Sequence, residues 1–150
     1  MARLQKDLKE FVELLLEKKV DFVVVGSYAL AFHGHSRFTQ DIDFFIGTSE
    51  ENASKLVVLV REFGFEALDL TQEHFKNPNM VVQLGSPPNR IDLLTVIDGL
   101  EFNEVWEGRQ YGDLDGLSVP FISRDHFLKN KRASGRPKDL ADVAELEWPD

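Results

Sequence analysis

The chain has 150 residues, of which 43% are hydrophobic and 29% charged, a composition that predicts a packed globular protein and excludes a disordered tail. Its 26 acidic residues exceed its 17 basic ones and give a formal net charge of −9, which excludes an extended nucleic-acid surface and leaves only local contacts through a basic patch or a metal ion. There is no cysteine, so disulfides, thiolate nucleophiles and cysteine-based zinc sites are excluded.

The first half of the chain predicts helices alternating with strands. Leucine and phenylalanine recur at helical spacing between charged residues over residues 1–19, which indicates an amphipathic helix. A continuous β-branched run indicates a buried strand over residues 21–25, and Ser27 is a candidate cap for a short helix over 28–33. A loop over 34–40 then precedes three further predicted elements: a strand over 41–46, a helix over 50–63 ended by Gly64, and an edge strand over 65–70.

The second half predicts hairpins as well as helices. The predicted strand pairs are 80–84 with 90–97, and 110–114 with 117–122 across Asp115-Gly116. The predicted helices cover residues 102–107, 123–133 and 137–146, the last with Pro137 in its first turn. This mixture favours an α+β fold, with a mixed β-sheet flanked by helices, over a doubly wound parallel sheet.

The chain carries no signal for a membrane span or for several domains. Its longest apolar run is far shorter than the roughly 20 residues of a membrane helix, and residues 1–19 lack the apolar core of a signal peptide. No repeat or long Pro/Gly/Ser-rich linker interrupts the sequence. We therefore expect one domain over residues 1–150, a cytoplasmic location and no membrane partner.

Two carboxylates stand one residue apart in an apolar strand. Asp41 and Asp43 are expected on one face of the strand over 41–46, because side chains alternate along a strand. Asp92 lies in a similar apolar strand and could reach the same side of the sheet. Three clustered carboxylates repel one another and, without a cation, need strongly raised pKa values, so the pattern predicts a divalent-cation site. Asp41→Asn is accordingly expected to raise the melting temperature in metal-free buffer.

Two further features are typical of anion binding. Gly26-Ser27 joins a strand to a helix, where free backbone N–H groups can bind phosphate, although such a pair more often only caps the helix. The densest basic cluster of the chain lies at a break between two predicted helices and consists of Lys129, Lys131, Arg132, Arg136 and Lys138. A solvated helix face is the ordinary interpretation of such a cluster, but its position beside Gly135 and Pro137 favours anion binding.

Taken together, Gly26-Ser27, Asp41-Ile42-Asp43 and Asp92 resemble the pattern of the nucleotidyltransferases of the DNA polymerase β-like superfamily. Residues 37–43, RFTQDID, and residues 131–142, KRASGRPKDLAD, look most like the small bacterial members, the minimal nucleotidyltransferases and relatives of AbiEii-type toxins. The resemblance runs from about Val20 to Leu146 and implies a fold like the polymerase β palm.

The resemblance implies a Mg²⁺-dependent transfer of a nucleoside monophosphate from an NTP, such as ATP, to a hydroxyl acceptor. Two Mg²⁺ ions, with Mn²⁺ as a possible substitute, would be held by Asp41, Asp43 and Asp92, which are also the implied catalytic residues, with Asp92 as candidate general base. The implied nucleotide-binding residues are Gly26, Ser27, Arg37, Thr39, Lys131, Arg136 and Lys138. Asp139 and Asp142 are expected to orient Lys131 or Arg136 by ion pairing.

Several alternatives stay open at this point. The acceptor could be a tRNA end, a protein hydroxyl or a small molecule such as an aminoglycoside, and the protein could be a component of a toxin–antitoxin pair. A catalytically silent nucleotide-binding or toxin–antitoxin partner module is the alternative from a different class. A D-x-D glycosyltransferase is a third interpretation, but it accounts neither for Asp92 nor for the basic cluster. The preferred base and the oligomeric state are not indicated by the sequence.

Overall fold

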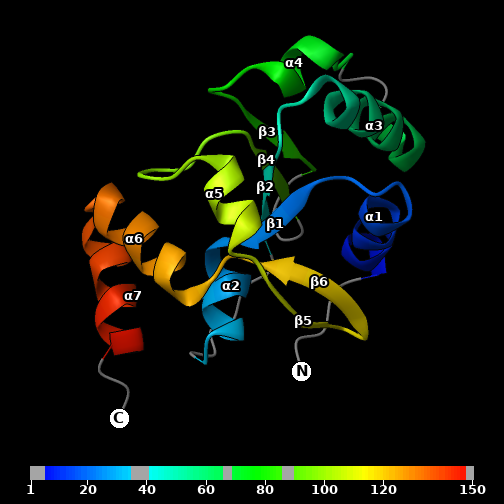
Figure 1. Ribbon diagram of the computed structural model, residues 1–150. Coiled ribbons are helices and arrows are strands. Elements are labelled where there is room, and N and C mark those ends of the chain that lie inside the picture. The colour runs from blue at the N-terminus through cyan, green and yellow to red at the C-terminus, as the bar shows by residue number, and fades with distance from the viewer. Residues whose placement is uncertain (1–5, 35–40, 66–68, 86–89, 148–150) are drawn as a thin grey trace.

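The structure is a computed structural model that describes residues 6–34, 41–65, 69–85 and 90–147. Six strands form one sheet in the order β3-β4-β2-β1-β6-β5 (Figure 1). The strands are β1 (Phe22–Val25), β2 (Ile42–Ile46), β3 (Val81–Leu84), β4 (Ile91–Leu94), β5 (Gln110–Leu114) and β6 (Leu117–Phe121). The helices are α1 (Lys6–Glu17), α2 (Gly26–Phe32), α3 (Glu50–Val60), the π-helical turn η1 (Arg61–Phe65), α4 (Gln72–Lys76), α5 (Phe102–Glu107), α6 (Arg124–Ser134) and α7 (Pro137–Glu147).

The sheet is mixed, as the sequence predicts. β2 runs parallel to β4 and antiparallel to β1, and β1 runs parallel to β6. The outer strands β3 and β5 complete antiparallel hairpins with β4 and β6, respectively. The prediction of an α+β fold with a mixed sheet is therefore confirmed.

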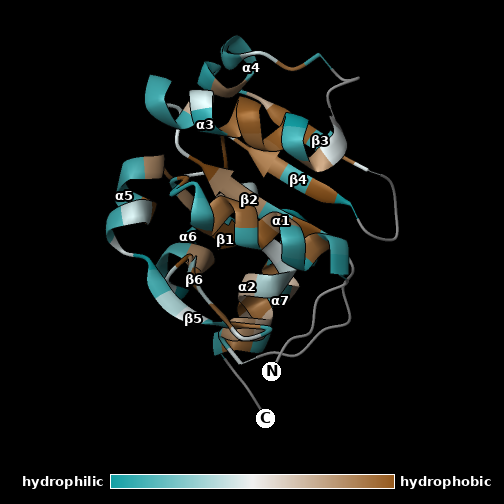
Figure 2. Ribbon diagram, turned by 90° about the vertical axis from the view of Figure 1, so that its right-hand side faces the viewer, coloured by the Kyte–Doolittle hydropathy of each residue, from teal (hydrophilic) through white to brown (hydrophobic). Residues whose placement is uncertain are grey.

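The core fixes which way each side chain of β2 points. Phe44 packs against Phe11 of α1, with ring centroids 5.9 Å apart, whereas Phe45 packs against Phe102 of α5 at 5.2 Å. Because successive side chains of a strand point to opposite faces, Asp43 lies on the same face as Phe45, away from α1. Figure 1 shows α1 and α3 on one side of the sheet and α6 and α7 on the other. Figure 2 shows the hydrophobic strands behind the amphipathic α1.

Three local predictions are wrong. α2 begins at Gly26 with Val25 as its N-cap and no side-chain cap, so Ser27 is not the cap. The edge strand predicted over residues 65–70 is absent from its described part: Phe65 ends η1 after Gly64 at φ 99°, and residues 69 and 70 are not in a strand. The following helix, α4, has no apolar periodicity to reveal it. The strand predicted over 90–97 ends at Leu94, because the chain turns back and Ile97 pairs with Leu100.

None of the helices in the described part of the chain is both long and apolar enough to cross a membrane.

Candidate functional site

Asp43 and Asp92 lie side by side at the centre of the sheet. In the parallel pairing of β2 with β4, Asp43 is the direct partner of Asp92. Partnered residues of neighbouring strands point to the same face, so both carboxylates emerge on the side away from α1. Asp92 is 7% exposed and Asp43 is half-buried. The structure thus brings together two acids that are 49 positions apart in the sequence.

Proximity and burial disturb the ionisation of this pair. Burial raises the pKa of Asp43 to about 7, with further contributions from a hydrogen bond and from charge repulsion by Asp92; Lys131 and Arg90 act in the opposite direction. A carboxyl group with this pKa holds its proton at neutral pH about half of the time. A cation bound between the two carboxyl groups would favour their ionised forms.

Gly26 forms the wall behind Asp43. It follows β1 directly and adopts φ 71°, a backbone conformation that side chains disfavour. A Cβ atom at this position would lie only 2.2 Å from Asp43 Oδ2. The glycine is thus required for close contact with the carboxylate, a role that the sequence pattern alone did not indicate.

Gly26→Ala is expected to destabilise the protein by about 2–4 kcal/mol, from the left-handed backbone and the clash with Asp43 together. Gly116→Ala is the matched control, because Gly116 has φ 87° but nothing within 4 Å of its would-be Cβ. It should show only the backbone cost of about 1–2 kcal/mol. Urea denaturation of both variants measures the difference, and equal losses would show that Gly26 and Asp43 are not in tight contact.

Asp41 is held by Arg90, which sequence reasoning missed. The Arg90 backbone N–H donates to Asp41 Oδ1 at 3.1 Å, and its guanidinium Nη2 lies 3.8 Å from Asp41 Oδ2. The same guanidinium donates to both oxygens of Asp92, from Nε at 2.8 Å and from Nη2 at 3.1 Å. Arg90 directly precedes β4, two positions before Asp92.

A basic wall faces the carboxylates from α6 and α7. Lys131 Nζ donates to Asp139 Oδ1 at 3.1 Å, while Ser134 Oγ and Arg136 Nε donate to Asp139 Oδ2 at 2.5 and 2.6 Å. Burial alone would raise the pKa of Asp139, but these hydrogen bonds, together with the Lys131 charge, lower it to about 2. Asp139 is therefore an anchored anion that fixes the direction of Lys131 and Arg136.

These walls enclose a cavity of about 440 Å³. The predicted site residues that line it are Gly26, Asp43, Asp92, Lys131, Arg136 and Asp139. Its other lining residues are Val25, Asn79, Leu94, Val96, Ile97, Asp98, Asn130 and Ser134. We call this space the central cleft.

Other predicted residues stand apart from the central cleft. Asp41, Ser27, Lys138 and Asp142 are not among its lining residues, and Asp142 is buried on α7. Arg37 and Thr39 lie outside the described residues. Their assignment to nucleotide binding therefore stays a prediction.

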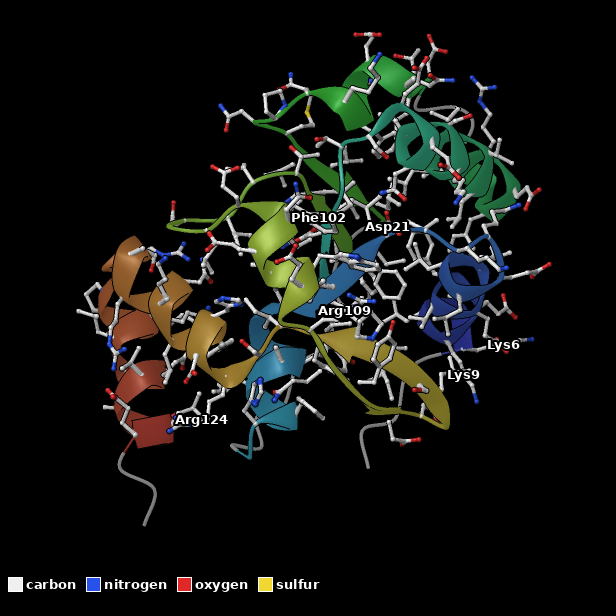
Figure 3. The ribbon with its side chains drawn as sticks, in the orientation of Figure 1. Lys6, Lys9, Asp21, Phe102, Arg109 and Arg124 are labelled. Carbon is white, nitrogen blue, oxygen red and sulfur yellow. The ribbon has the colours of Figure 1, made fainter. Side chains whose placement is uncertain are left out.

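Two further hollows have the wrong chemistry for a phosphate. One of about 650 Å³ between α1 and η1 is lined by Asp7, Glu10, Glu13, Leu14, Glu17, Glu62 and Phe63. The other, of about 340 Å³, lies at the opposite end of β1 and β2, between Asp21 and Phe102 (Figure 3). Neither has a lysine or arginine among its described lining residues, whereas the central cleft has both.

The donor set of the central cleft fits a divalent metal ion. Asp43 and Asp92 offer carboxylate oxygens, which Mg²⁺ prefers. The raised pKa of Asp43 comes first from burial and then from its hydrogen bond with Asp92 and the charge of that residue, and a bound cation would favour the ionised form. In the part of the chain that the structure describes, no group of three or more acidic or histidine side chains is arranged to hold a metal. The arrangement of three carboxylates around two ions stays a prediction.

The sequence of residues 4–147 matches the model of a protein family described as "Nucleotidyl transferase of unknown function (DUF2204)". The chain belongs to this family. No curated protein is similar enough in sequence to count as a match. The fold of this family member also occurs in solved structures of nucleotidyltransferases.

Three such structures share the fold at low sequence identity. The lincosamide antibiotic adenylyltransferase LnuA, solved with lincomycin bound, has a TM-score of 0.58 and 13% identity, covering 100% of both chains. A putative nucleotidyltransferase from Thermotoga maritima has a TM-score of 0.61 and 15% identity, covering 97% of this chain and 96% of its own. An antigenic nucleotidyltransferase-like protein from Paracoccidioides brasiliensis has a TM-score of 0.54 and 16% identity, covering 97% of this chain and 78% of its own.

Proposed function

We propose that this nucleotidyltransferase family member is a Mg²⁺-dependent enzyme that transfers a nucleoside monophosphate from an NTP to a hydroxyl group and releases pyrophosphate. The observation that carries the proposal is the central cleft, in which Asp43 and Asp92 face Lys131 and Arg136. Carboxylates can hold a metal ion and basic side chains can hold a triphosphate, and the cleft offers both within one space.

Each wall of the central cleft has a separate task in this proposal. Asp43 and Asp92, with Asp41 as the third predicted ligand, would hold Mg²⁺, which supplies charge neutralisation and activation of the attacking hydroxyl. Lys131 and Arg136 would bind the phosphates; Lys131 has a largely covered side chain, whereas the Arg136 side chain is 73% exposed and is tied to Asp139 through its Nε. Asp139 would keep Lys131 in place. A general-base role for Asp92 stays a prediction.

The acceptor is the least defined part of the proposal. Beyond the carboxylates, the central cleft continues along Leu94, Val96 and Ile97, with Asn79 and Asn130 as polar partners, so a partly apolar hydroxyl compound would fit its chemistry. The net charge of −9 opposes an RNA acceptor. Because LnuA, which shares the fold, was solved with lincomycin, small molecules are the first class to test. An AbiEii-type or toxin–antitoxin role stays a prediction.

The test is a label-transfer assay with Mg²⁺ and each α-³²P-labelled NTP, using small-molecule, RNA and protein fractions of a lysate as separate acceptors. We expect label in one fraction, loss of that label when EDTA is added, and a higher melting temperature with Mg²⁺–NTP. The silent-module alternative predicts no transfer. Absence of both transfer and any thermal shift would contradict nucleotide binding altogether.

Lys131→Gln is expected to weaken Mg²⁺–NTP binding by about tenfold or more, because a charge-assisted hydrogen bond to phosphate is lost. Lys129→Gln is the matched control: Lys129 is on the same helix and carries the same charge, but it is exposed and does not line the central cleft. Isothermal titration calorimetry measures both dissociation constants. Equal weakening in the two variants would indicate only a general effect of charge.

A further inference from the structure

The guanidinium of Arg90 sits among the carboxylates that are proposed to hold the metal. It forms a two-pronged contact with both oxygens of Asp92, at 2.8 and 3.1 Å, and lies 3.8 Å from an oxygen of Asp41. Such fork-like contacts are among the strongest ion pairs in proteins. The negative charge of these carboxylates is therefore balanced, in part, by the Arg90 guanidinium.

The backbone of Arg90 is fixed, so only its side chain can leave. Its N–H donates to Asp41 Oδ1, and its carbonyl accepts a hydrogen bond from the N–H of Ile42, both at 3.1 Å. These bonds tie the start of β4 to the start of β2. The side chain, by contrast, is 28% exposed and borders solvent, so rotation about its bonds can carry the guanidinium away without moving the sheet.

A divalent cation and this guanidinium cannot share Asp92 without a large cost. A metal ion bound to an Asp92 oxygen would stand within a few ångströms of the Arg90 charge, where like charges repel strongly. Arg90 also occupies the gap between Asp41 and Asp92, although both acids are predicted ligands of the same site. Among the described residues, no group of three potential metal ligands is assembled.

We propose that Arg90 is a built-in counter-ion, which holds Asp41 and Asp92 together in the metal-free protein and which a divalent cation must displace in order to bind. The inference rests on the proposed metal site of the central cleft. Arg90 is thus a positioning residue whose exchange with metal reorganises the site. It stabilises the empty site and weakens metal binding, two effects of opposite sign.

The test compares Arg90→Gln with Arg132→Gln by titration with Mn²⁺ in the absence of nucleotide, followed by electron paramagnetic resonance of the free ion. Arg132 is the matched control, because it also pairs with a carboxylate, that of Glu147. Neither Arg132 nor Glu147 lines the central cleft. Arg90→Gln is expected to bind Mn²⁺ about tenfold more tightly than the wild type, and Arg132→Gln within about twofold. In EDTA, Arg90→Gln should melt below the wild type, since Asp92 keeps a buried charge without its partner.

The Mn²⁺ titrations separate the role of Arg90 from the existence of the metal site. Equal or weaker Mn²⁺ binding by Arg90→Gln overturns the counter-ion role but leaves the metal site intact, whereas no binding by any of the proteins contradicts the proposed metal site as well. If Arg90→Gln does not fold, NMR of arginine Nε–H groups in the wild type gives the answer. With Mg²⁺, the Arg90 Nε–H should exchange with water several-fold faster than without it, and an unchanged rate overturns the inference.

Discussion

The Asp43→Asn variant is expected to lose nucleotidyl transfer by about 10³-fold or more, since it removes a metal-ligand charge worth several kcal/mol to the transition state. Asparagine has nearly the same shape, and Asp43 lies between Gly26 and Asp92, so the fold should be kept. The initial rate of label transfer at saturating Mg²⁺–NTP measures the effect.

Asp113→Asn is the matched control for this experiment. Asp113 is also a strand aspartate, but it is exposed on β5, at the edge of the sheet and separated from β2 by β1 and β6. Its replacement should leave the rate within about twofold of the wild type, as for most surface changes. Similar losses in both variants, or a nearly unchanged rate in Asp43→Asn, would contradict the assignment of Asp43.

The same Asp43→Asn variant is expected to be more stable than the wild type in EDTA at pH 8. Asp43 has a pKa of about 7 in the folded protein, against an ordinary value of 3.8 for an aspartate, so between these pH values the folded state binds a proton that the unfolded state has lost. Stability from this group therefore falls as the pH rises from about 4 to about 7 and stays low above it. The free energy of unfolding lost in this way is on the order of 2–4 kcal/mol, and asparagine avoids the loss because its side chain does not ionise.

Urea denaturation of both proteins in EDTA at pH 5 and at pH 8 separates this effect from others. The advantage of the variant should be large at pH 8 and small at pH 5. Asp139 does not interfere: its pKa of about 2 means that its stabilising contribution is lost only as the pH falls from about 4 toward 2. An advantage that is larger at pH 5 than at pH 8 would contradict the raised pKa of Asp43.

The structure places the stabilising substitution at Asp43, whereas the sequence pattern places it at Asp41. The sequence pattern predicts relief of repulsion in Asp41→Asn, but Asp41 accepts a hydrogen bond from the Arg90 backbone and lies near the Arg90 guanidinium. Removing the Asp41 charge therefore takes away an attraction as well as a repulsion. The stabilising change is expected at Asp43, which the structure places against Asp92.

Local patterns predicted most of the fold and part of the site. Helical spacing of apolar residues indicated the first helix, and a continuous β-branched run indicated β1. The D-x-D strand with a third acid indicated a metal site. The pairing of Asp43 with Asp92 depends on strand order and register, which a single sequence does not specify. The predicted cap at Ser27 is wrong because the helix begins at Gly26, which has a positive φ, two residues earlier than predicted.

The roles of the basic residues required tertiary structure. Sequence spacing suggested that Asp139 orients Lys131 or Arg136, and the structure shows both contacts, because the Gly135 C-cap brings the start of α7 back toward the end of α6. Arg90 was overlooked because its significance depends on two acids that belong to different strands. A charge beside an apolar strand is usually only solvated, and nothing local distinguishes this one.

The most direct test of the central claim is a crystal structure of the protein with Mn²⁺ and a non-hydrolysable NTP, with the metal located by its anomalous scattering. The account predicts a metal peak at coordination distance from the carboxylates of both Asp43 and Asp92, with the triphosphate against Lys131 and Arg136. A nucleotide bound outside the central cleft, or a metal that touches neither aspartate, would contradict it.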